Sequence, residues 1–306
     1  MNDERLTAAL DWARSVLGPA HPRELKNRPW GATWQVSRPD GTDVFLKAST
    51  PHTGHEAALM TVLARVCPDL VPPLVAADPP GHRLIVASAG TVLRTLAPAG
   101  DPHRAFDLDV WTSLVQRFAD LQRRVTPHAG ELLALGVPDE RPHQLLGMLR
   151  SFTTAPRLPE AERHRLTLIA TRWEERGTGL SSSTVEPSVQ HGDLHDNNVA
   201  VDAEGRARFF DFGDATVAHP FGTMDVPRLM ARGAGVDDRG VARLEDAYLE
   251  VFTDLAPLPR LRDELRAVLA VAPLHRARNW LRALGSDAAA AAEWDHPVEH
   301  WLGRLR

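Results

Sequence analysis

One segment of the chain concentrates the side chains that could do chemistry. Residues 189–215, VQHGDLHDNNVAVDAEGRARFFDFGDA, hold six acidic residues, two histidines and two adjacent asparagines. The apolar runs at 199–201 and 209–210, with a polar turn at 202–205 between them, predict a β-hairpin. The segment is either a set of ordinary polar hairpin loops or a group of oxygen ligands gathered around one highly charged partner.

The oxygen-rich side chains at the ends of this hairpin fit a hard cation. Asn198 and Asp211 are expected to meet at its open end, and carboxylate and amide oxygens are the ligands that Mg²⁺ prefers. Asp193 is nearby but is not needed for the metal, so it is available to accept a proton from an attacking hydroxyl group. Metal ligands for phosphates and one acid that orients the nucleophile are the parts that phosphoryl transfer uses.

The spacing of these residues resembles the aminoglycoside phosphotransferase and choline kinase family, a relative of the protein kinases. His191–Asp193 is followed by four residues and then Asn198, and Asp211–Gly213 supplies the Asp-Phe-Gly of a metal loop. The resemblance implies an α+β, bilobal protein-kinase-like fold. Such a fold has a small N-terminal antiparallel sheet lobe and a larger, mainly helical C-terminal lobe.

The same resemblance implies an activity and its cofactors. ATP, or alternatively GTP, would donate its γ-phosphate to a hydroxyl group of a small molecule in the presence of Mg²⁺. Asp193 would be the catalytic base, and Asn198 and Asp211 would hold the metal ion. His191 is expected to buttress the loop rather than to act in the chemistry.

The N-terminal part contains further residues that the resemblance assigns to nucleotide binding. Lys47 ends an apolar strand and would bind the α- and β-phosphates; the alternative is a solvated lysine at a strand end. Glu56 is expected to pair with Lys47 or else only to close a helix-capping box. Gly31 marks the segment that would cover the phosphates, although no Gly-x-Gly-x-x-Gly is present. Ala87 and Ala89 mark the segment whose backbone would meet the adenine edge.

Hydrophobic periodicity and turn residues predict the elements that must position this site. Residues 1–88 are predicted to form the nucleotide-binding lobe: a helix, two strands joined by the turn Pro39–Gly41, a second helix and a further strand. Residues 89–306 are predicted to form the catalytic and substrate-binding lobe, whose only evident β-structure is the hairpin. The longest helix of that lobe, at 261–285, is expected to bend or break at Pro273. The other helices are predicted at 110–124, 145–152, 161–176 and 241–256.

Composition limits the classes of protein that the chain can belong to. Its 306 residues can bury a large core, and its net charge of −5 comes from mixed signs, which argues against a nucleic-acid partner. The single cysteine allows no disulfide framework. The sequence shows neither a signal peptide nor an apolar run long enough to cross a membrane. We therefore expect a cytoplasmic monomer or dimer without a membrane partner.

The acceptor is expected to bind among the C-terminal helices. Asp225 is the acidic residue best placed to line a pocket, whereas the acids at 237–250 are typical of a helix cap and a solvated helix face. His275, Asn279 and Trp280 lie close together in the sequence and suit a sugar, a nucleoside-like compound or an antibiotic. The alternative is that Trp280 packs in the core while the neighbouring arginines face solvent.

The charge of the same segment favours one kind of acceptor. Arg276 and Arg278 would repel choline and favour a neutral or partly anionic compound. We therefore predict a kinase of an antibiotic, a sugar or a nucleoside-like compound. The alternatives are a kinase of an amino alcohol such as choline and a non-catalytic nucleotide-binding regulatory module of the same fold. A protein kinase is disfavoured because no Ala-Pro-Glu follows the Asp211–Gly213 motif to anchor a peptide-binding segment.

Overall fold

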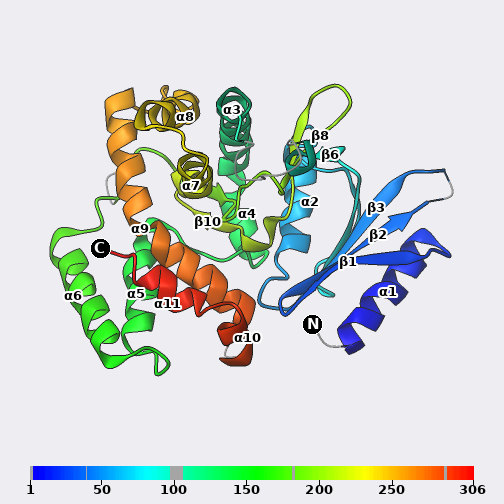
Figure 1. The fold of residues 1–306 in the computed structure, drawn as a ribbon, viewed down its shortest axis with the longest axis horizontal. Helices are drawn as coiled ribbons and strands as arrows, with labels where there is room; N and C mark the ends of the chain where they lie inside the picture. Colours follow the sequence, from blue (N-terminus) through cyan, green and yellow to red (C-terminus); the bar gives the residue numbers. More distant parts are fainter. Residues whose placement is uncertain (1–2, 39, 97–105, 181–182, 286–287) are drawn as a thin grey trace.

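The architecture is the predicted α+β one, with a five-stranded antiparallel sheet first and a larger, mainly helical part after it (Figure 1). A computed structural model of the chain describes residues 3–38, 40–96, 106–180, 183–285 and 288–306. Over these ranges, no helix is both long enough and apolar enough to cross a membrane.

The N-terminal part contains two helices and five strands. In chain order they are α1 (Asp3–Leu17), β1 (Pro22–Arg28), β2 (Gly31–Ser37), β3 (Asp43–Ser49), α2 (Glu56–Val66), β4 (Leu74–Asp78) and β5 (Arg83–Ala87). The strand order in the sheet is β1-β2-β3-β5-β4, so β1 and β4 are the two edge strands. Helix α2 connects β3 to β4 and stands between the sheet and the C-terminal part (Figure 1).

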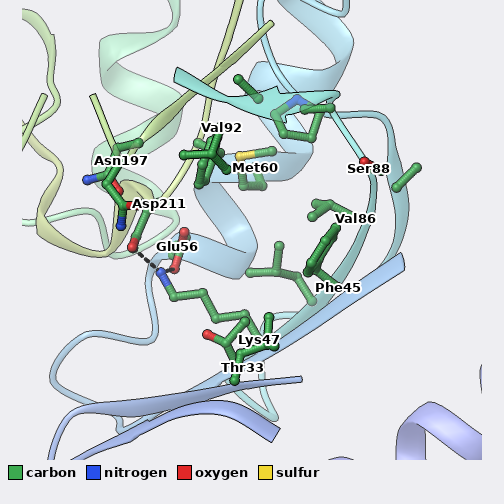
Figure 2. A pocket seen from close by; sticks show the side chains of 18 of the residues that line it. Thr33, Phe45, Lys47, Glu56, Met60, Val86, Ser88, Val92, Asn197 and Asp211 are labelled. Atoms are coloured by element: carbon green, nitrogen blue, oxygen red, sulfur yellow. Dashed lines mark hydrogen bonds and ion pairs between the residues drawn. The ribbon is translucent and has the colours of Figure 1, made fainter. Parts of the chain in front are cut away.

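The two faces of this sheet have different neighbours because side chains alternate along each strand. Trp34 and Leu46 point to the outer face, where they form a buried cluster with Ala13 of α1. Thr33 and Lys47 precede and follow those residues in β2 and β3, and they point to the inner face. That inner face lies toward α2 and the C-terminal part, and it lines a cavity (Figure 2).

The C-terminal part combines helices with short strands that hold the polar segment at 189–215. One small sheet has the order β6-β8-β9, and β7 pairs with β10. These strands are β6 (Thr91–Val92), β7 (Ser188–Gln190), β8 (Val199–Val201), β9 (Ala207–Phe209) and β10 (Thr216–Ala218). The α-helices are α3 (Leu108–Val125), α4 (Ala129–Ala134), α5 (Leu145–Thr153), α6 (Glu160–Arg176), α7 (Asp225–Gly233), α8 (Asp238–Glu250), α9 (Leu258–Leu284), α10 (Ala288–Glu293) and α11 (Pro297–Leu302). Short 3₁₀ turns are η1 (Leu93–Leu96), η2 (Thr126–His128), η3 (Pro142–Gln144), η4 (Phe212–Asp214) and η5 (Pro220–Met224).

The structure differs from the sequence-based elements in places that have physical reasons. Strand β1 could not be predicted from the sequence, because this edge strand is polar and exposed and lacks hydrophobic alternation. The helix that was expected to bend or break at Pro273 does not break there: α9 is continuous through this residue, and Figure 1 shows it changing direction along its length. The helix predicted at 241–256 ends at Glu250. Pro39 of the predicted turn lies outside the described residues, while Gly41 has the expected positive φ of 80°.

A buried polar cluster ties α9 to the chain before α5 and to the end of η4. Glu140 is 1% exposed, and its carboxylate accepts a hydrogen bond from Arg282 and lies 2.5 Å from Nδ1 of His275. Arg282 also donates to the side chain of Asn279, whose amide group donates to the backbone oxygen of Asp214 at 3.3 Å. The cluster therefore holds η4 in place from the side of α9.

The ionisation of Glu140 gives this cluster a defined pH dependence. Burial raises the pKa of Glu140, but the positive charge of Arg282 and the contact with His275 lower it overall from 4.5 to about 2. A carboxyl group whose pKa is lower in the folded state stabilises the fold fully above its unfolded-state pKa. This contribution is lost as the pH falls through the interval from about 4.5 to about 2.

We expect Glu140→Gln to lower the free energy of unfolding by about 3–5 kcal/mol at neutral pH, because Arg282 then keeps a largely buried charge without its partner. Urea unfolding at neutral pH and in acid measures the effect, which should shrink as the pH falls toward 2. Glu131→Gln is the control, since it removes an exposed carboxylate that lies 2.7 Å from Arg65 and should have a much smaller effect. Equal effects of the two substitutions, or a loss that does not change with pH, would contradict this account.

Candidate active site

A cavity of about 280 Å³ lies between the inner face of the sheet, α2 and the β8–β9 hairpin. Its walls are apolar near β5 and β6, where Phe45, Met60 and Val86 line it, and one end is charged (Figure 2). Leu25 and Lys26 of β1, which the sequence analysis does not single out, line it as well. An apolar slot with a charged end can hold a flat aromatic group beside an ionic one.

The segment after β5 forms one wall of this cavity. Ala87 and Ala89, both predicted to meet the adenine edge, line it. The Ala87 N–H donates to the backbone oxygen of Pro73 at 2.9 Å, so this N–H is not free to bond a ligand. Gly90 has a φ of 111°, and a Cβ atom there would lie 2.3 Å from the backbone oxygen of Val201, so the close approach of this segment to β8 requires glycine.

Lys47 is the centre of the charged end. Its ammonium group lies 2.6 Å from Oε2 of Glu56 and donates to Oδ1 of Asp211 (Figure 2). The other carboxylate oxygen of Glu56 accepts from the Phe212 N–H at 2.8 Å. The expected Lys47–Glu56 ion pair is therefore present, and no side chain caps the start of α2 at His55. Burial disfavours the charge of Lys47, but the two carboxylates more than offset this and raise its pKa.

Asp211 and Asn198 both line the cavity, as the hairpin predicts. Asp211 has a left-handed backbone, with a φ of 65° and a ψ of 61°, a conformation that aspartate tolerates better than most residues. Burial raises its pKa, but Lys47 and, to a smaller extent, Lys26 lower it overall, so the carboxylate is ionised. The side-chain N–H of Asn198 donates to the backbone oxygen of Asp193 at 2.8 Å, which leaves the amide oxygen available for a cation.

Both carboxylate oxygens of Asp193 have polar neighbours. Oδ1 lies 3.3 Å from Nη1 of Arg276, and Oδ2 lies 3.2 Å from Nε2 of His195. The Nδ1 atom of His195 accepts from the Asn197 N–H at 3.0 Å, so the ring proton is on Nε2 and points to Asp193. Burial raises the pKa of Asp193, but the bond from His195 and the charge of Arg276 lower it well below its usual range. Asp193 is therefore a carboxylate at neutral pH.

The backbone around Asp193 is held in place by the buried side chain of His191 and by a close contact at Gly192. His191 is fully buried; its Nε2 donates to the Phe210 oxygen at 3.1 Å and its Nδ1 accepts from the Asp193 N–H at 3.3 Å. Burial lowers the pKa of His191 to about 4, so it is neutral, in keeping with the expected buttressing position. Gly192 has a φ of 79°, and a Cβ atom would lie 2.5 Å from the Asp214 oxygen. Only glycine lets these two loops approach so closely.

The predicted acceptor residues are not among those that line the cavity, and they do not form one group. Arg276 lies 3.4 Å from Asp225 and 5.3 Å from the ring centre of Trp301, so Asp225 and Asp193 share one arginine. His275 and Asn279 are buried and bonded within the Glu140 cluster. Gly31, predicted to cover the phosphates, begins β2, where it pairs with both Arg28 and Ser49.

Trp280 packs in an aromatic cluster that connects the two parts of the molecule. Its ring centre lies 5.7 Å from that of Trp30, in the β1–β2 turn, and 5.6 Å from that of Trp294, in the turn after α10. Arg28 lies 5.4 Å above the Trp294 ring. The sequence analysis does not identify this cluster. The position of Trp30 directly before Gly31 is a usable hint, but nothing local indicates that Trp294 reaches the same place.

Comparisons with known proteins agree with this geometry. Residues 31–261 match the model of the phosphotransferase enzyme family. No curated protein sequence matches the chain. A solved macrolide 2′-phosphotransferase from Brachybacterium faecium is 19% identical with a TM-score of 0.58, over 99% of this chain and 98% of that chain.

Two further solved structures are similar over nearly their whole length. The GDP complex of an aminoglycoside 2′-phosphotransferase is 15% identical with a TM-score of 0.60, over 99% of each chain. A choline kinase from Streptococcus pneumoniae is 10% identical with a TM-score of 0.59, over 98% of each chain. At these identities the likeness shows the fold, which is the predicted kinase-like one. Because the family model covers most of the sequence, the chain belongs to the phosphotransferase enzyme family, whose members act on small molecules.

Proposed function

We propose that this phosphotransferase transfers the γ-phosphate of ATP, or alternatively of GTP, to a hydroxyl group of a small molecule. The observation that carries the proposal is the meeting of Lys47, Asn198 and Asp211 at one end of the cavity, with ionised Asp193 on the same loop as Asn198. The nucleotide would lie between the lobes formed by residues 1–88 and 89–306. The GDP bound to a neighbour of the same fold supports a nucleotide in this place and keeps GTP as a candidate donor.

The donor atoms at the cavity fit a Mg²⁺ ion that takes its other ligands from phosphates and water. Asn198 would offer its amide oxygen, and Asp211 would offer its ionised carboxylate. In the part of the chain that the structure describes, no three His, Cys, Asp or Glu side chains gather as a metal site. When bound, the ion would neutralise charge that develops on the phosphates. Lys47 would bind the same phosphates from the side of β3.

Asp193 is the group that would act on the acceptor. Its carboxylate would take the proton of the acceptor hydroxyl while that oxygen forms its bond to the γ-phosphorus and the bond to the bridging β–γ oxygen breaks. His195 and Arg276 hold the two oxygens of Asp193 and so fix the direction in which it can accept a proton. The acceptor hydroxyl would have to approach on the side that these two contacts leave open.

The charges around Asp193 favour a neutral or partly anionic acceptor. Arg276 stands between Asp193 and Asp225, where it cancels much of the negative charge that an ammonium group would need. Trp301 lies against Arg276 and adds a flat apolar surface. We propose an antibiotic, a sugar or a nucleoside-like compound as the acceptor. The macrolide phosphotransferase of the same fold supports the first of these.

Asp193→Asn should reduce kcat by about 10²–10⁴-fold, the scale of a general base, because the acceptor hydroxyl loses its proton acceptor. Nucleotide affinity in calorimetry should stay close to that of the wild type, since the amide keeps the size of the carboxylate. Asp211→Asn is the contrasting variant: it should lose Mg²⁺-dependent nucleotide binding as well as turnover. A fully active Asp193→Asn variant would exclude Asp193 as the base.

An acceptor screen tests the charge of the acceptor site. With ATP or GTP as donor, phosphate should reach a hydroxyl compound that is neutral or partly anionic, while choline and polycationic aminoglycosides should be poor acceptors. Arg276→Ala should lower kcat/KM for an anionic acceptor more than for a neutral one of similar size. Efficient phosphorylation of choline would contradict the assignment of Arg276. Nucleotide binding without transfer to any acceptor would instead favour the non-catalytic regulatory module.

A further inference from the structure

The only two lysines of this chain both line the cavity. Among 35 basic residues other than histidine, the sequence has 33 arginines and only two lysines, Lys26 and Lys47. Both side chains line the nucleotide-sized cavity, which is lined by 20 residues in all. Solvated positions elsewhere in the chain carry arginine. A lysine that only kept β1 soluble could therefore have been arginine, and its position at the cavity needs another explanation.

The register of the sheet explains how Lys26 reaches this face. Glu24 pairs with Trp34, which points to the outer face, and Lys26 pairs with Thr33, which points into the cavity. Two residues that are two positions apart in a regular strand would share a face. Here Leu25 is an extra residue in β1, and this β-bulge turns Lys26 to the inner face. Bulges commonly re-aim a side chain next to a functional site.

The same register places the two lysines in one row. Thr33 pairs with Lys26 on one side and with Lys47 on the other, so the three side chains cross β1, β2 and β3 at one level. All three line the cavity. The row therefore includes the charged end of the cavity, where Lys47 meets Glu56 and Asp211.

The charge balance at this end calls for a second cation. Lys47 is paired with both Glu56 and Asp211, so its positive charge is already matched before a nucleotide binds. A triphosphate with Mg²⁺ still carries net negative charge. Within the described part of the chain, the ammonium group of Lys26 has no hydrogen bond or ion pair and is exposed to solvent. A compact ammonium group on a flexible stem can follow phosphate oxygens as a point charge, whereas the guanidinium of arginine is a larger planar fork.

We propose that Lys26 is a second phosphate-binding residue, which reaches from β1 over the terminal phosphates of the nucleoside triphosphate. It would do part of the work of the glycine-rich loop, which the sequence lacks. This inference rests on the proposed function, since it concerns the same nucleotide. It adds a binding residue that neither the motif spacing nor the apolar pattern of the strands identifies.

Calorimetry on wild type, Lys26→Ala, Lys26→Arg and Arg23→Ala tests the proposal. Each protein is titrated with Mg·ATP, Mg·GTP, adenosine and guanosine at low and high salt. Lys26→Ala should lower the affinity for the triphosphate that the wild type binds by about 10–100-fold, which is the effect of losing one charge-assisted hydrogen bond. Its affinity for the matching nucleoside should not change. The loss of triphosphate affinity should be smaller at high salt. The affinity of Lys26→Arg should lie between those of the wild type and Lys26→Ala.

Arg23→Ala is the matched control because it removes a positive charge from the same strand. Arg23 donates to Gln35 and is not among the described residues that line the cavity. Its triphosphate affinity should equal that of the wild type. Equal triphosphate affinities of Lys26→Ala and wild type, an equal loss in Arg23→Ala, or a parallel loss of nucleoside affinity would overturn the role of Lys26. A wild type that binds no nucleotide would refute the proposed function itself, so the two failures can be told apart.

Discussion

The site depends on one ammonium group that is held between two carboxylates. Lys47 comes from the sheet, Glu56 from the helix behind it and Asp211 from the loop 164 positions later in the chain. A charge that is largely removed from water is tolerated only when it is paired, and loss of one partner of such a group usually costs several kcal/mol. The triad therefore fixes the distance between the sheet, α2 and the loop that carries Asp211. It also keeps the ammonium group pointed into the cavity.

The loops that carry Asp193 and Asp211 are in turn held by groups that do not touch the cavity. His191 links the two loops from below through backbone atoms, and Gly192 allows the second loop to lie against the first. From the other side, the buried Glu140 cluster reaches the backbone of Asp214 through the side chains of α9. Phosphoryl transfer needs little covalent help from a protein and depends mainly on position and charge. In this chain, buried hydrogen bonds fix the positions of the groups in the site, and paired charges provide its electrostatics.

The sequence predicts the centre of the site better than its surroundings. The hairpin and the position of Asn198 and Asp211 at its open end follow from local patterns, and the Lys47–Glu56 pair follows from the family resemblance. All are present. The partners of α9 could not be predicted in this way. A helical pattern indicates which residues share a face, but it does not indicate that the side chain of His275 contacts the carboxylate of Glu140.

The sheet shows the same limit. β1 has no hydrophobic alternation because it is an exposed edge, so the periodicity of its residues carries no information about it. The bulge at Leu25 depends on pairing with β2, which is a property of two strands together. Without that pairing, the sequence would place Glu24 and Lys26 on the same face. The surroundings of Asp193 are also set by contacts between distant residues, such as those of Arg276 with Asp193 and Asp225.

We propose that the Lys47 triad is the phosphate site of a nucleotide-dependent phosphotransferase. Because the chain has only two lysines, a protein labelled with ε-¹⁵N-lysine gives two side-chain ammonium signals in an NMR spectrum, and Lys26→Arg assigns them. If the triad binds the phosphates, the Lys47 signal should shift on titration with Mg·ATP or Mg·GTP, and the shift should saturate with the Kd found by calorimetry. A Lys47 signal that does not move while calorimetry shows the nucleotide binding would place the phosphates elsewhere and contradict the account.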